Sequence, residues 1–405
     1  MENALRYKNY QYFIGGSFFT LLGDYIGFAA LNWVIWTHTA SELNLGIINF
    51  IRLLPALFIG FVGGSLADKY NQKKLLILIY LSIAFFNFAL FFIVLNKNIN
   101  IILIGFIVGL RGLFVEMEPS VRNALLPHLI EKEAICSAVS IYTSVLNITA
   151  ILGPALAGIA LAKMDSGFLF LFQFLGQILV IISLFFIKNI QENSSVNILE
   201  KNTKKSNYSD VFLYLKAHPD LLCILFAGCI LMFFLFPYIG LMPAFVNAST
   251  NMGPEIYGRF LMISALGTIL GSSLISLLRK KIQVLFILST AALASIAIIS
   301  LGTANHIFLM YIFLFLLGFL SQISRTANRV YFQIKSPNEI RGKLISLVLS
   351  DRGFLPFGTL LAGFLAHNFG MPNTFIIFGM CSFFFIILLF ITYQVKERKV
   401  SNEAR

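Results

Sequence analysis

The feature that most constrains this chain is a series of apolar runs of roughly 20 residues, each long enough to cross a bilayer as a helix. Hydrophobic residues make up 58% and charged residues 12% of the 405 positions, whereas a soluble domain carries about 25% charged residues. In lipid the backbone must satisfy its own hydrogen bonds, so such runs form helices or a closed barrel. A barrel needs short strands of alternating polarity, and the run 376–390 does not alternate. The sequence therefore predicts an all-α membrane protein.

The apolar runs predict twelve membrane-spanning helices, six in each half of the chain. In the first half they cover 12–37, 45–67, 75–95, 99–120, 135–162 and 167–187, and in the second half 222–246, 257–278, 284–303, 307–327, 343–368 and 372–393. The first run is too long for the apolar core of a signal peptide, and we expect it to be retained. We predict an N-terminal six-helix bundle (1–187), a polar cytoplasmic linker (188–221) and a C-terminal six-helix bundle (222–405).

The distribution of Lys and Arg predicts the orientation in the membrane. An even number of spans places both termini on one side, and 24 of the 30 Lys and Arg residues then lie on that side, three on the other and three inside spans. The side rich in Lys and Arg is cytoplasmic, so we expect both termini there. Because the cations are scattered over span ends, the net charge of +12 indicates topology, and we expect no nucleic-acid partner.

The two halves carry similar motifs at nearly one offset. Gly153 and Gly358 each begin a small-residue run in the fifth span of their half, 205 residues apart (358 − 153). Arg122 and Arg329 precede these spans and lie 207 residues apart (329 − 122). Six is an even number, so the two copies have the same topology and are related by a pseudo-two-fold axis along the membrane normal.

The loop between the second and third spans carries a family marker. The residues Gly64-Ser-Leu-Ala-Asp68-Lys69-Tyr-Asn-Gln-Lys73 are similar to the signature G-x-L-a-D-r-x-G-r-k of the major facilitator superfamily. Together with twelve spans and the repeat, this loop resembles that superfamily over essentially the whole chain. The resemblance implies a major facilitator fold and transport by alternating access.

Two positions of this loop depart from the family pattern. Asn71 stands where the family has Gly, and we expect the turn to survive because Asn tolerates a left-handed backbone. Gln72 replaces a cation that usually makes an ion pair, for which Lys73 or Arg122 is a candidate substitute.

Two further stretches point to a branch of the superfamily. The run Gly153-Pro154…Gly158 looks like the antiporter motif G-P-x-x-G-G, with Ala157 in place of its first paired Gly; close helix packing through small residues is the other reading. The stretch 118–127 (EPSVRNALLP) resembles macrolide-efflux and enterobactin-type siderophore exporters. These resemblances imply drug:proton antiport chemistry.

Ionisable residues inside a membrane span are costly and by default mark function. Asp24 lies near the middle of the first span, and the first, fourth, seventh and tenth helices line the central cavity in this superfamily. Burial disfavours the charged form of a carboxyl, so Asp24 can change protonation as access alternates, and we predict that it couples proton movement to transport. The alternative is a structural carboxylate paired with a neighbouring helix. Arg111 in the fourth span is a candidate to pair with Asp24 or to bind an anionic group of the substrate.

Other charged residues are assigned to a cytoplasmic gate, to the membrane interface or to no particular role. Glu116 and Glu118 are expected to join Asp68 in a network that locks the cytoplasmic side in one state and breaks in the other. The predicted gate residues are Gly64, Asp68, Lys69, Lys73, Glu116, Glu118 and Arg122. Arg52 is explained by snorkelling to the interface. Asp351 and Arg352 are adjacent, so they are expected to point to different faces.

Aromatic and polar residues on the cavity helices are candidates for substrate contact. A pocket of aromatic side chains with few polar groups suits a bulky amphipathic ligand. The predicted cavity residues are Arg111, Asn32, Tyr142, Asn147, Phe233, Phe236, Tyr238, Gln322 and Arg325.

These predictions favour export of a small amphipathic molecule, driven by inward proton flow. The substrate is a drug such as a macrolide or a siderophore; the embedded arginines favour an anionic siderophore and Asp24 a cation. A proton-coupled importer, or an exporter of another metabolite, is the alternative. A membrane enzyme would need a buried catalytic set, and all five His residues fall in loops or at helix ends, with no HExxH or Walker A motif. We expect no catalytic residue, cofactor or metal, and a monomer in a bacterial inner membrane whose partners are lipid, protons and a small molecule.

Overall fold

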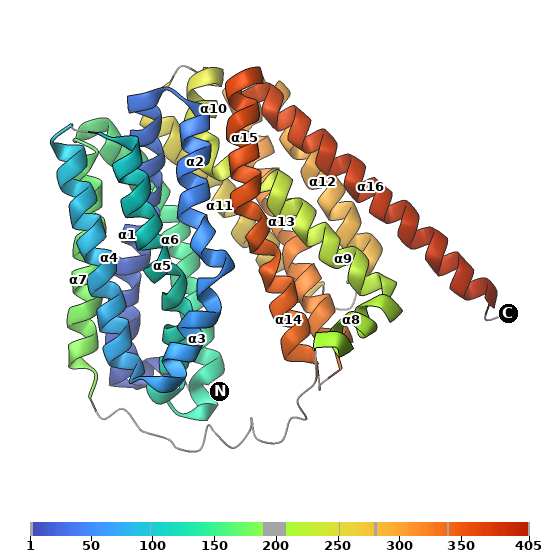
Figure 1. Ribbon diagram of the computed structural model, residues 1–405, viewed down its shortest axis with the longest axis horizontal. Coiled ribbons are helices and arrows are strands. Elements are labelled where there is room, and N and C mark those ends of the chain that lie inside the picture. The colour runs from blue at the N-terminus through green and yellow to red at the C-terminus, as the bar shows by residue number, and fades with distance from the viewer. Residues whose placement is uncertain are drawn as a thin grey trace. The chain divides into compact units, whose positions relative to one another are not determined.

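The computed structural model describes residues 3–97, 99–188, 208–250, 252–278, 282–337 and 340–403. The described residues form helices and their connections, with no strand among them (Figure 1), so the predicted all-α class is confirmed. The chain forms two compact units. Unit 1 is Met1–Ser195, Met242–Asn247 and Asn251–Met262, and unit 2 is Val196–Leu241, Ala248–Thr250 and Ile263–Arg405. The predicted bundle boundaries stay a prediction, and most of the predicted linker (189–207) lies outside the described residues.

The first half of the chain contributes seven α-helices to unit 1 (Figure 1). They are α1 (Lys8–Thr39), α2 (Glu42–Leu53), α3 (Ile59–Lys69), α4 (Gln72–Leu95), α5 (Ile101–Leu125), α6 (Ile135–Lys163) and α7 (Gly167–Phe186). Helix α1 packs on α6 and α7, α4 packs on α5 and α7, and α5 also contacts α2 and α3. Large apolar side chains on the outer faces remain exposed, including Phe85, Phe106 and Phe185, as expected of surfaces that meet lipid.

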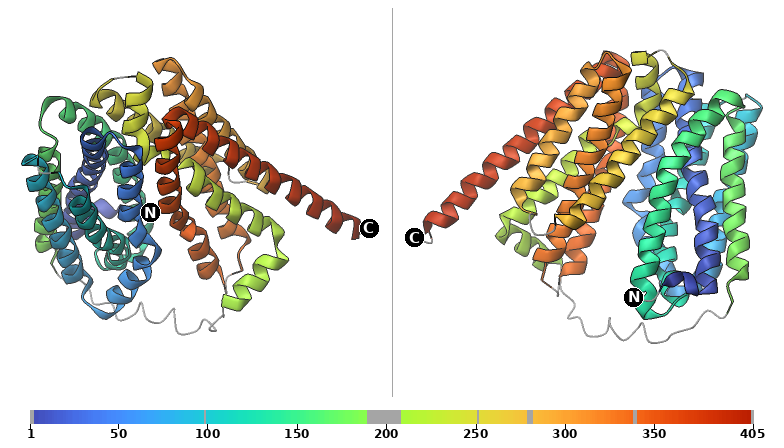
Figure 2. Two further views of the ribbon diagram at one scale, coloured as in Figure 1. Left: turned by 45° about the horizontal axis from the view of Figure 1, so that its top comes forward. Right: turned by 180° about the vertical axis from the view of Figure 1, so that it is seen from behind.

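The second half of the chain contributes the remaining described helices (Figure 2). They are α8 (Tyr208–Ala217), α9 (Pro219–Ile230), α10 (Tyr238–Thr250), α11 (Pro254–Leu277), α12 (Val284–Thr303), α13 (Ile307–Lys335), α14 (Arg341–Leu349), α15 (Leu355–Phe369) and α16 (Met371–Glu403). Within unit 2, α12 packs on α13 and α16, and α9 packs on α16.

In the described part of the chain, ten helical segments are long and apolar enough to span a membrane, and each overlaps a predicted span. The predicted spans 45–67 and 99–120 do not reach that standard. The first is divided at a 3₁₀ turn, Leu54–Leu57, that begins with Pro55 in its first turn; proline lacks the N–H that a continuous helix needs. The second is the continuous helix α5, but it carries Arg111, Glu116 and Glu118. The count of twelve therefore stays a prediction.

Two other helices are interrupted in unit 2, both near predicted cavity residues. A π-helical segment, Leu231–Leu235, follows α9, and π-bulges occur frequently at functional sites. A 3₁₀ segment, Ser350–Phe354, separates α14 from α15 and carries Asp351 and Arg352. Asp351 is buried and Arg352 exposed, so the two side chains do point to different sides.

Candidate functional site

The side chain of Asp24 lies at the centre of unit 1. Its Oδ1 accepts hydrogen bonds from Arg111 Nη2 at 2.9 Å and from Gln173 Nε2 at 2.8 Å, and a longer one from Gln177 Nε2 at 3.5 Å. Arg111 Nε donates to Asn87 Oδ1 at 2.8 Å. Residues from α1, α4, α5 and α7 thus meet at one ion pair, which joins the two charges that the sequence singles out.

Local sequence explains how this cluster forms. Gly27 lies one turn after Asp24, and a Cβ there would overlap the side chain of Gln173. Glycine at this position therefore leaves room for the Gln173 amide to reach Asp24. Asn100 caps α5 by accepting hydrogen bonds from the backbone N–H groups of Ile102 and Leu103, which defines where the helix carrying Arg111 begins.

Asp24 separates two cavities within unit 1. Thr20 and Glu118 line the smaller one, and Phe28 and Arg52 line the larger one. Asp24 and Val115 line both of them. The Arg111 side chain is 11% exposed and that of Asp24 36% exposed, so the carboxylate faces open space on either side while its cation is buried in the wall.

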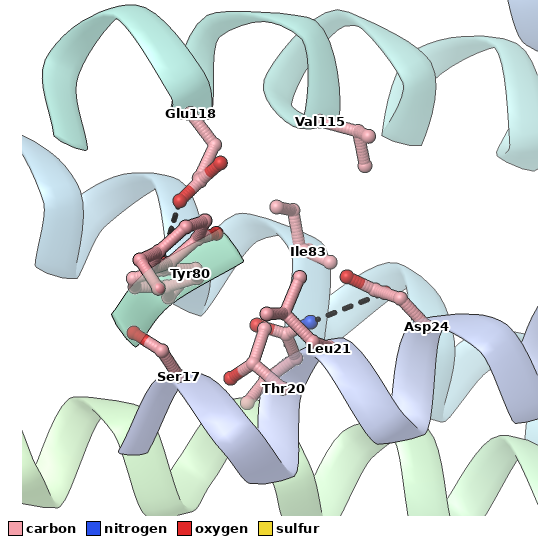
Figure 3. A pocket seen from close by; sticks show the side chains of 10 residues that line it. Ser17, Thr20, Leu21, Asp24, Tyr80, Ile83, Val115 and Glu118 are labelled. Carbon is pink, nitrogen blue, oxygen red and sulfur yellow. Dashed lines mark hydrogen bonds between the residues drawn. The ribbon is translucent and has the colours of Figure 1, made fainter. Parts of the chain in front are cut away.

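Most of the side chains that line the smaller cavity carry a polar group, and Figure 3 shows Asp24 at one end of it and Glu118 at the other. Glu118 Oε1 accepts a hydrogen bond from the Tyr80 hydroxyl at 2.8 Å and pairs with Arg122 Nε at 3.0 Å. The Arg122 guanidinium also lies 4.1 Å from the ring centroid of Tyr142. The residues that line the smaller cavity are Ser17, Thr20, Leu21, Asp24, Tyr80, Ile83, Val115, Glu118, Tyr142 and Gln177.

The larger cavity contains a cation that sequence reasoning assigned elsewhere. Arg52, at the end of α2, lines this cavity together with Arg111 and Asp24, so the expected snorkelling to the membrane interface is wrong. The Arg52 guanidinium lies 4.6 Å from the ring centroid of Phe28. The remaining lining is mostly apolar: Gly27, Phe28, Leu31, Leu90, Val108, Val115 and Phe170, with Gln173. The charge of Arg52 within a predicted span could have marked it as a cavity residue, but the sequence does not show which face of its helix meets a cavity.

The predicted gate residues are only partly brought together. Glu118 and Arg122 pair with each other, whereas Asp68 is exposed and makes no ion pair among the described residues. Glu118 therefore belongs to the cavity beside Asp24, and its expected pairing with Asp68 is absent from this structure. Glu116, like Gly64, is half-buried, and Lys69 is exposed.

The loop after α3 closes differently from the prediction. Asn71 has extended backbone angles (φ −61°, ψ 115°), and its side chain caps α4 by accepting a hydrogen bond from Lys74 N at 3.1 Å. The left-handed turn expected at Asn71 is thus wrong, because Asn is also a preferred N-cap residue. Gln72 Nε2 donates to the carbonyl of Ala67, and Lys73 Nζ donates to the carbonyl of Ile187 at 2.8 Å. Lys73 fastens the loop to the end of α7 rather than replacing the lost ion pair.

The small-residue run of α6 is buried in unit 1. Gly153, Pro154 and Gly158 are all buried, and a Cβ at Gly153 would overlap the side chain of Tyr25 in α1. Close packing of α6 on α1 therefore requires glycine there. This contact supports the packing reading of the motif, and a role in antiport stays a prediction.

Two other predicted cavity residues of unit 1 have different surroundings. Asn32 is fully buried, and its Oδ1 accepts a hydrogen bond from Asn49 Nδ2 at 2.6 Å. This bond joins α1 to α2, so Asn32 has a structural explanation. Asn147 is half-buried in α6 and is not among the residues that line the two cavities.

In unit 2, two of the predicted cavity residues contact each other. The Arg325 guanidinium lies 5.3 Å from the ring centroid of Phe236. Phe233 packs edge-on against Phe234, and the buried hydroxyl of Tyr238 is hydrogen-bonded to Ser264. Gln322 Nε2 donates to Thr326 Oγ1 at 3.2 Å along α13.

Arg325 also belongs to a buried cluster of charges that was not predicted as a unit. Its Nε lies 4.0 Å from Asp351 Oδ2. Arg325 Nε, Arg329 Nε, Arg329 Nη2 and Asp351 Oδ1 are buried without a hydrogen-bond partner in the described structure. The charges in this cluster are close, but they are poorly satisfied. In the part of the chain that the structure describes, no three His, Cys, Asp or Glu side chains lie together as a metal site would require.

Comparison with known families identifies the chain. The family model described as transmembrane secretion effector matches residues 3–405. The chain belongs to this family. It is a multi-pass membrane transporter of the major facilitator superfamily, and it moves small molecules rather than converting them, as the resemblance implied.

Two curated relatives and two solved structures place the transporter more closely. It is 33% identical over 380 residues to the staphyloferrin A transporter of Staphylococcus aureus, covering 91% of this chain and 92% of that one. It is 22% identical to macrolide efflux protein A of Streptococcus pyogenes, covering 86% and 87%. A nucleoside transporter structure superposes with a TM-score of 0.76 at 12% identity, covering 95% and 99%. A bacterial homologue of ferroportin in an inward-facing state superposes with 0.72 at 16% identity, covering 97% and 99%. These structures share the fold.

Proposed function

We propose that the transporter exports a siderophore by proton antiport and alternating access, with Asp24 as the proton carrier. The observation that supports this most directly is the position of Asp24 between two cavities, paired with Arg111. A carboxylate that faces water-accessible space can exchange a proton, and its paired cation makes the charged state tolerable. Protonation would weaken the ion pair and bias unit 1 toward a second conformation.

The substrate proposal rests on the relatives and on the larger cavity. The 33% identity to a staphyloferrin A transporter spans nearly all of both chains, and two arginines in the cavity wall suit a ligand with anionic groups. The apolar remainder of the wall and the macrolide efflux relative support a drug such as a macrolide as a second candidate. A proton-coupled importer, or an exporter of another metabolite, is the remaining alternative.

The topology and the gate belong to the same proposal. Bacterial relatives and the Lys and Arg distribution support a bacterial inner-membrane protein with both termini in the cytoplasm. We propose that it acts as a monomer. The predicted two-bundle division and the gating role of Asp68 and Lys69 are proposed on the family signature in the loop after α3. Among the candidate cavity residues, Arg111, Tyr142 and Arg325 are supported by their position beside buried charges.

A transport assay in cells tests the proposal. The protein is expressed in a host that lacks its own drug pumps and siderophore exporter, and two quantities are measured: siderophore secreted under iron limitation, and accumulation of a dye and macrolide panel. We expect secretion that stops with a protonophore and with Asp24→Asn, but not with Glu131→Gln, an exposed acid on a loop. Secretion that persists in Asp24→Asn cells treated with the protonophore would contradict proton coupling. Reduced macrolide accumulation without secretion would favour the drug candidate.

A further inference from the structure

Helix α8 is a short element of unit 2 that the proposed transport does not use, and its two faces differ. Val211 and Leu215 lie four residues apart, on one side of the helix, and both are buried. Phe212 and Leu213 are 71% and 66% exposed. Lys216 is also exposed, and helical spacing places it between these two side chains on the outward face. The outward face of α8 therefore carries two large apolar side chains and one cation.

Contacts with three neighbouring helices hold α8 in this orientation. The Tyr214 hydroxyl donates a hydrogen bond to the carbonyl of Lys335, at the end of α13, at 3.0 Å. The Tyr214 ring also stacks on the His218 imidazole, with ring centroids 3.9 Å apart. Helix α8 packs on α9 and α14 as well (Figure 1). The buried face is thus fixed against unit 2, and the apolar outward face stays turned away from it.

The place of α8 in the chain puts it at the surface of the bilayer. Helix α9 begins at Pro219, and the segment Pro219–Thr250 is long and apolar enough to span a membrane. His218 is the one residue between α8 and α9, and it has non-helical backbone angles (φ −119°, ψ 83°), because a following proline disfavours helical ones. Helix α8 therefore ends where the span begins, at the boundary between lipid and water.

We propose that α8 binds the surface of the lipid bilayer, with Phe212 and Leu213 among the acyl chains and Lys216 near the lipid phosphates. An aromatic and an aliphatic side chain beside a cation are typical of a helix that lies in the membrane interface. A lysine can rest its methylene groups on an apolar surface while its ammonium group reaches the headgroups. Helix α8 would then anchor this end of unit 2 to the membrane surface.

The outward face of α8 adjoins other exposed apolar side chains, and these belong to spans. Phe226 of α9 is exposed. Ile334 of α13 is exposed too, and it precedes Lys335, whose carbonyl accepts the hydrogen bond from α8. Both α9 and α13 belong to segments that can cross a membrane, so lipid already surrounds the neighbourhood of α8. This continuity favours lipid over a second protein as the partner of the exposed face.

Photocrosslinking of the purified full chain in dioleoylphosphatidylcholine nanodiscs tests this. The amino acid p-benzoylphenylalanine, which attaches to nearby C–H groups on illumination, is placed at Phe212. We expect the mass of one phospholipid to be added to the peptide that contains this position. Alkaline hydrolysis of the lipid esters should leave a fatty acid attached, because the acyl chain is the expected point of attachment. The same amino acid at Glu131, which is exposed on a loop, is the control and should give no lipid adduct.

The adduct also distinguishes lipid from the other occupants. Attachment of the label at Phe212 to another peptide of the same chain, or to a second copy of the chain, would overturn the proposal. Absence of any lipid adduct at this position would overturn it as well.

Hydrogen exchange in the same nanodiscs measures the anchoring. Phe212→Asp and Leu213→Asp should each raise the exchange rate of the α8 amides about tenfold, because a carboxylate on this face opposes insertion and favours local opening of the helix. Gln333→Asp is the matched control, since Gln333 is exposed near the end of α13 and lies outside the apolar face of α8. Unchanged exchange in both α8 variants would contradict the anchor.

This inference goes beyond the proposed function, because it involves neither the substrate nor Asp24. Proton-coupled secretion in cells, with no lipid adduct at Phe212, would remove the anchor and leave the proposed function standing. A lipid adduct together with secretion that ignores the protonophore would leave the anchor standing and remove the proton coupling.

Discussion

The buried charges of the two units differ in how completely they are satisfied. In unit 1, Asp24 and Arg111 are in direct contact at 2.9 Å, with amides completing the cluster and a cavity on each side. In unit 2, Arg325 and Asp351 approach only to 4.0 Å, and several of their polar atoms lack partners. The same superfamily fold thus contains one charge cluster whose acid and base are directly hydrogen-bonded and one whose acid and bases are not.

The repeat makes this difference more informative. Glu118 and Arg122 of α5 correspond to Arg325 and Arg329 of α13 at one offset of 207 residues (325 − 118). The first copy has an acid and a base one helical turn apart, which pair at 3.0 Å. The second copy has two bases, and its acid, Asp351, comes from a 3₁₀ segment. The first copy has kept carboxylates beside its cavities, so we assign proton chemistry to unit 1 and a structural or switching role to the cluster of unit 2.

The largest expected effect is that of Asp24→Asn. The variant cannot bind and release a proton at this position, so transport against a gradient should fall to the level of cells without the protein. Transport down a gradient should survive, because the amide retains the size of the carboxyl. Counterflow of labelled substrate in proteoliposomes measures the second property. Asp351→Asn, the corresponding change in unit 2, should leave proton coupling intact; loss of coupling there would reverse the assignment of the two units.

The second effect is on stability, through double-mutant cycles at the two ion pairs. Removing one partner of a fully buried pair costs about 3–5 kcal/mol. The Asp24 side chain is partly exposed, so Arg111→Gln should destabilise unit 1 by less than that. Adding Asp24→Asn should recover most of that loss, with a coupling energy of about 2–3 kcal/mol. The Arg325–Asp351 cycle should give less than about 1 kcal/mol, because the two charges are not hydrogen-bonded. Unfolding experiments in detergent measure both coupling energies. Equal values would contradict the conclusion that the charges of unit 1 are more strongly paired than those of unit 2.

A third, smaller effect concerns Glu118. If protons reach Asp24 through the smaller cavity, Glu118→Gln should slow proton-driven transport about tenfold, the equivalent of one charged hydrogen bond, without abolishing it. Tyr80→Phe, which removes the hydroxyl that donates to Glu118, should slow it less. Initial rates after a pH jump in proteoliposomes measure this. Glu133→Gln, an exposed acid, is the control, and unchanged rates in Glu118→Gln would exclude this route.

The fold class and the central ion pair could be predicted from sequence because they depend on single, strong signals. Apolar runs define helices in lipid, and Asp24 and Arg111 were conspicuous as charges within them. The surroundings of Arg52 and Glu118 could not be predicted, because a one-dimensional pattern does not show which face of a helix meets a cavity. Glu118 was assigned to the Asp68 gate by family analogy, whereas Tyr80 and Arg122 hold it in the cavity wall.

Local backbone features were missed for a related reason. The second predicted span was drawn from its apolar character alone, without regard to Pro55, and the structure divides the span there. Asn71 was interpreted through the Gly of the family motif, although Asn serves equally as an N-cap, which is its role here. In both cases the residue type allowed two structures, and the packing of the neighbouring helices selects one of them.

Unit 2 has more buried cations than acids beside Asp351, and removing one cation should therefore cost little stability. Arg325→Gln removes one of two neighbouring buried cations. This relieves the repulsion between Arg325 and Arg329, but it also removes a cation that attracts Asp351. We expect these terms to offset, leaving the free energy of unfolding within about 1 kcal/mol of wild type. Asp351→Asn should instead destabilise by about 3 kcal/mol, because it removes the acid of the cluster. Denaturant unfolding in detergent measures the free energy of unfolding of both variants. A larger decrease for Arg325→Gln than for Asp351→Asn would show that the cations are not in excess.

The smallest structural effect is expected at Asp68, which is exposed and lacks an ion pair among the described residues. Asp68→Asn should change the free energy of unfolding by less than about 0.5 kcal/mol, as surface substitutions usually do. If Asp68 acts in a gate, turnover should still fall, because its partner would be met only in another conformation. Lys74→Gln, at an exposed position nearby, is the control for charge alone. Normal turnover in Asp68→Asn would mean that the charges needed for transport in unit 1 all belong to the cluster around Asp24. Slow turnover with unchanged stability would mean that Asp68 acts during the conformational change, unlike the charges that are hydrogen-bonded in this structure.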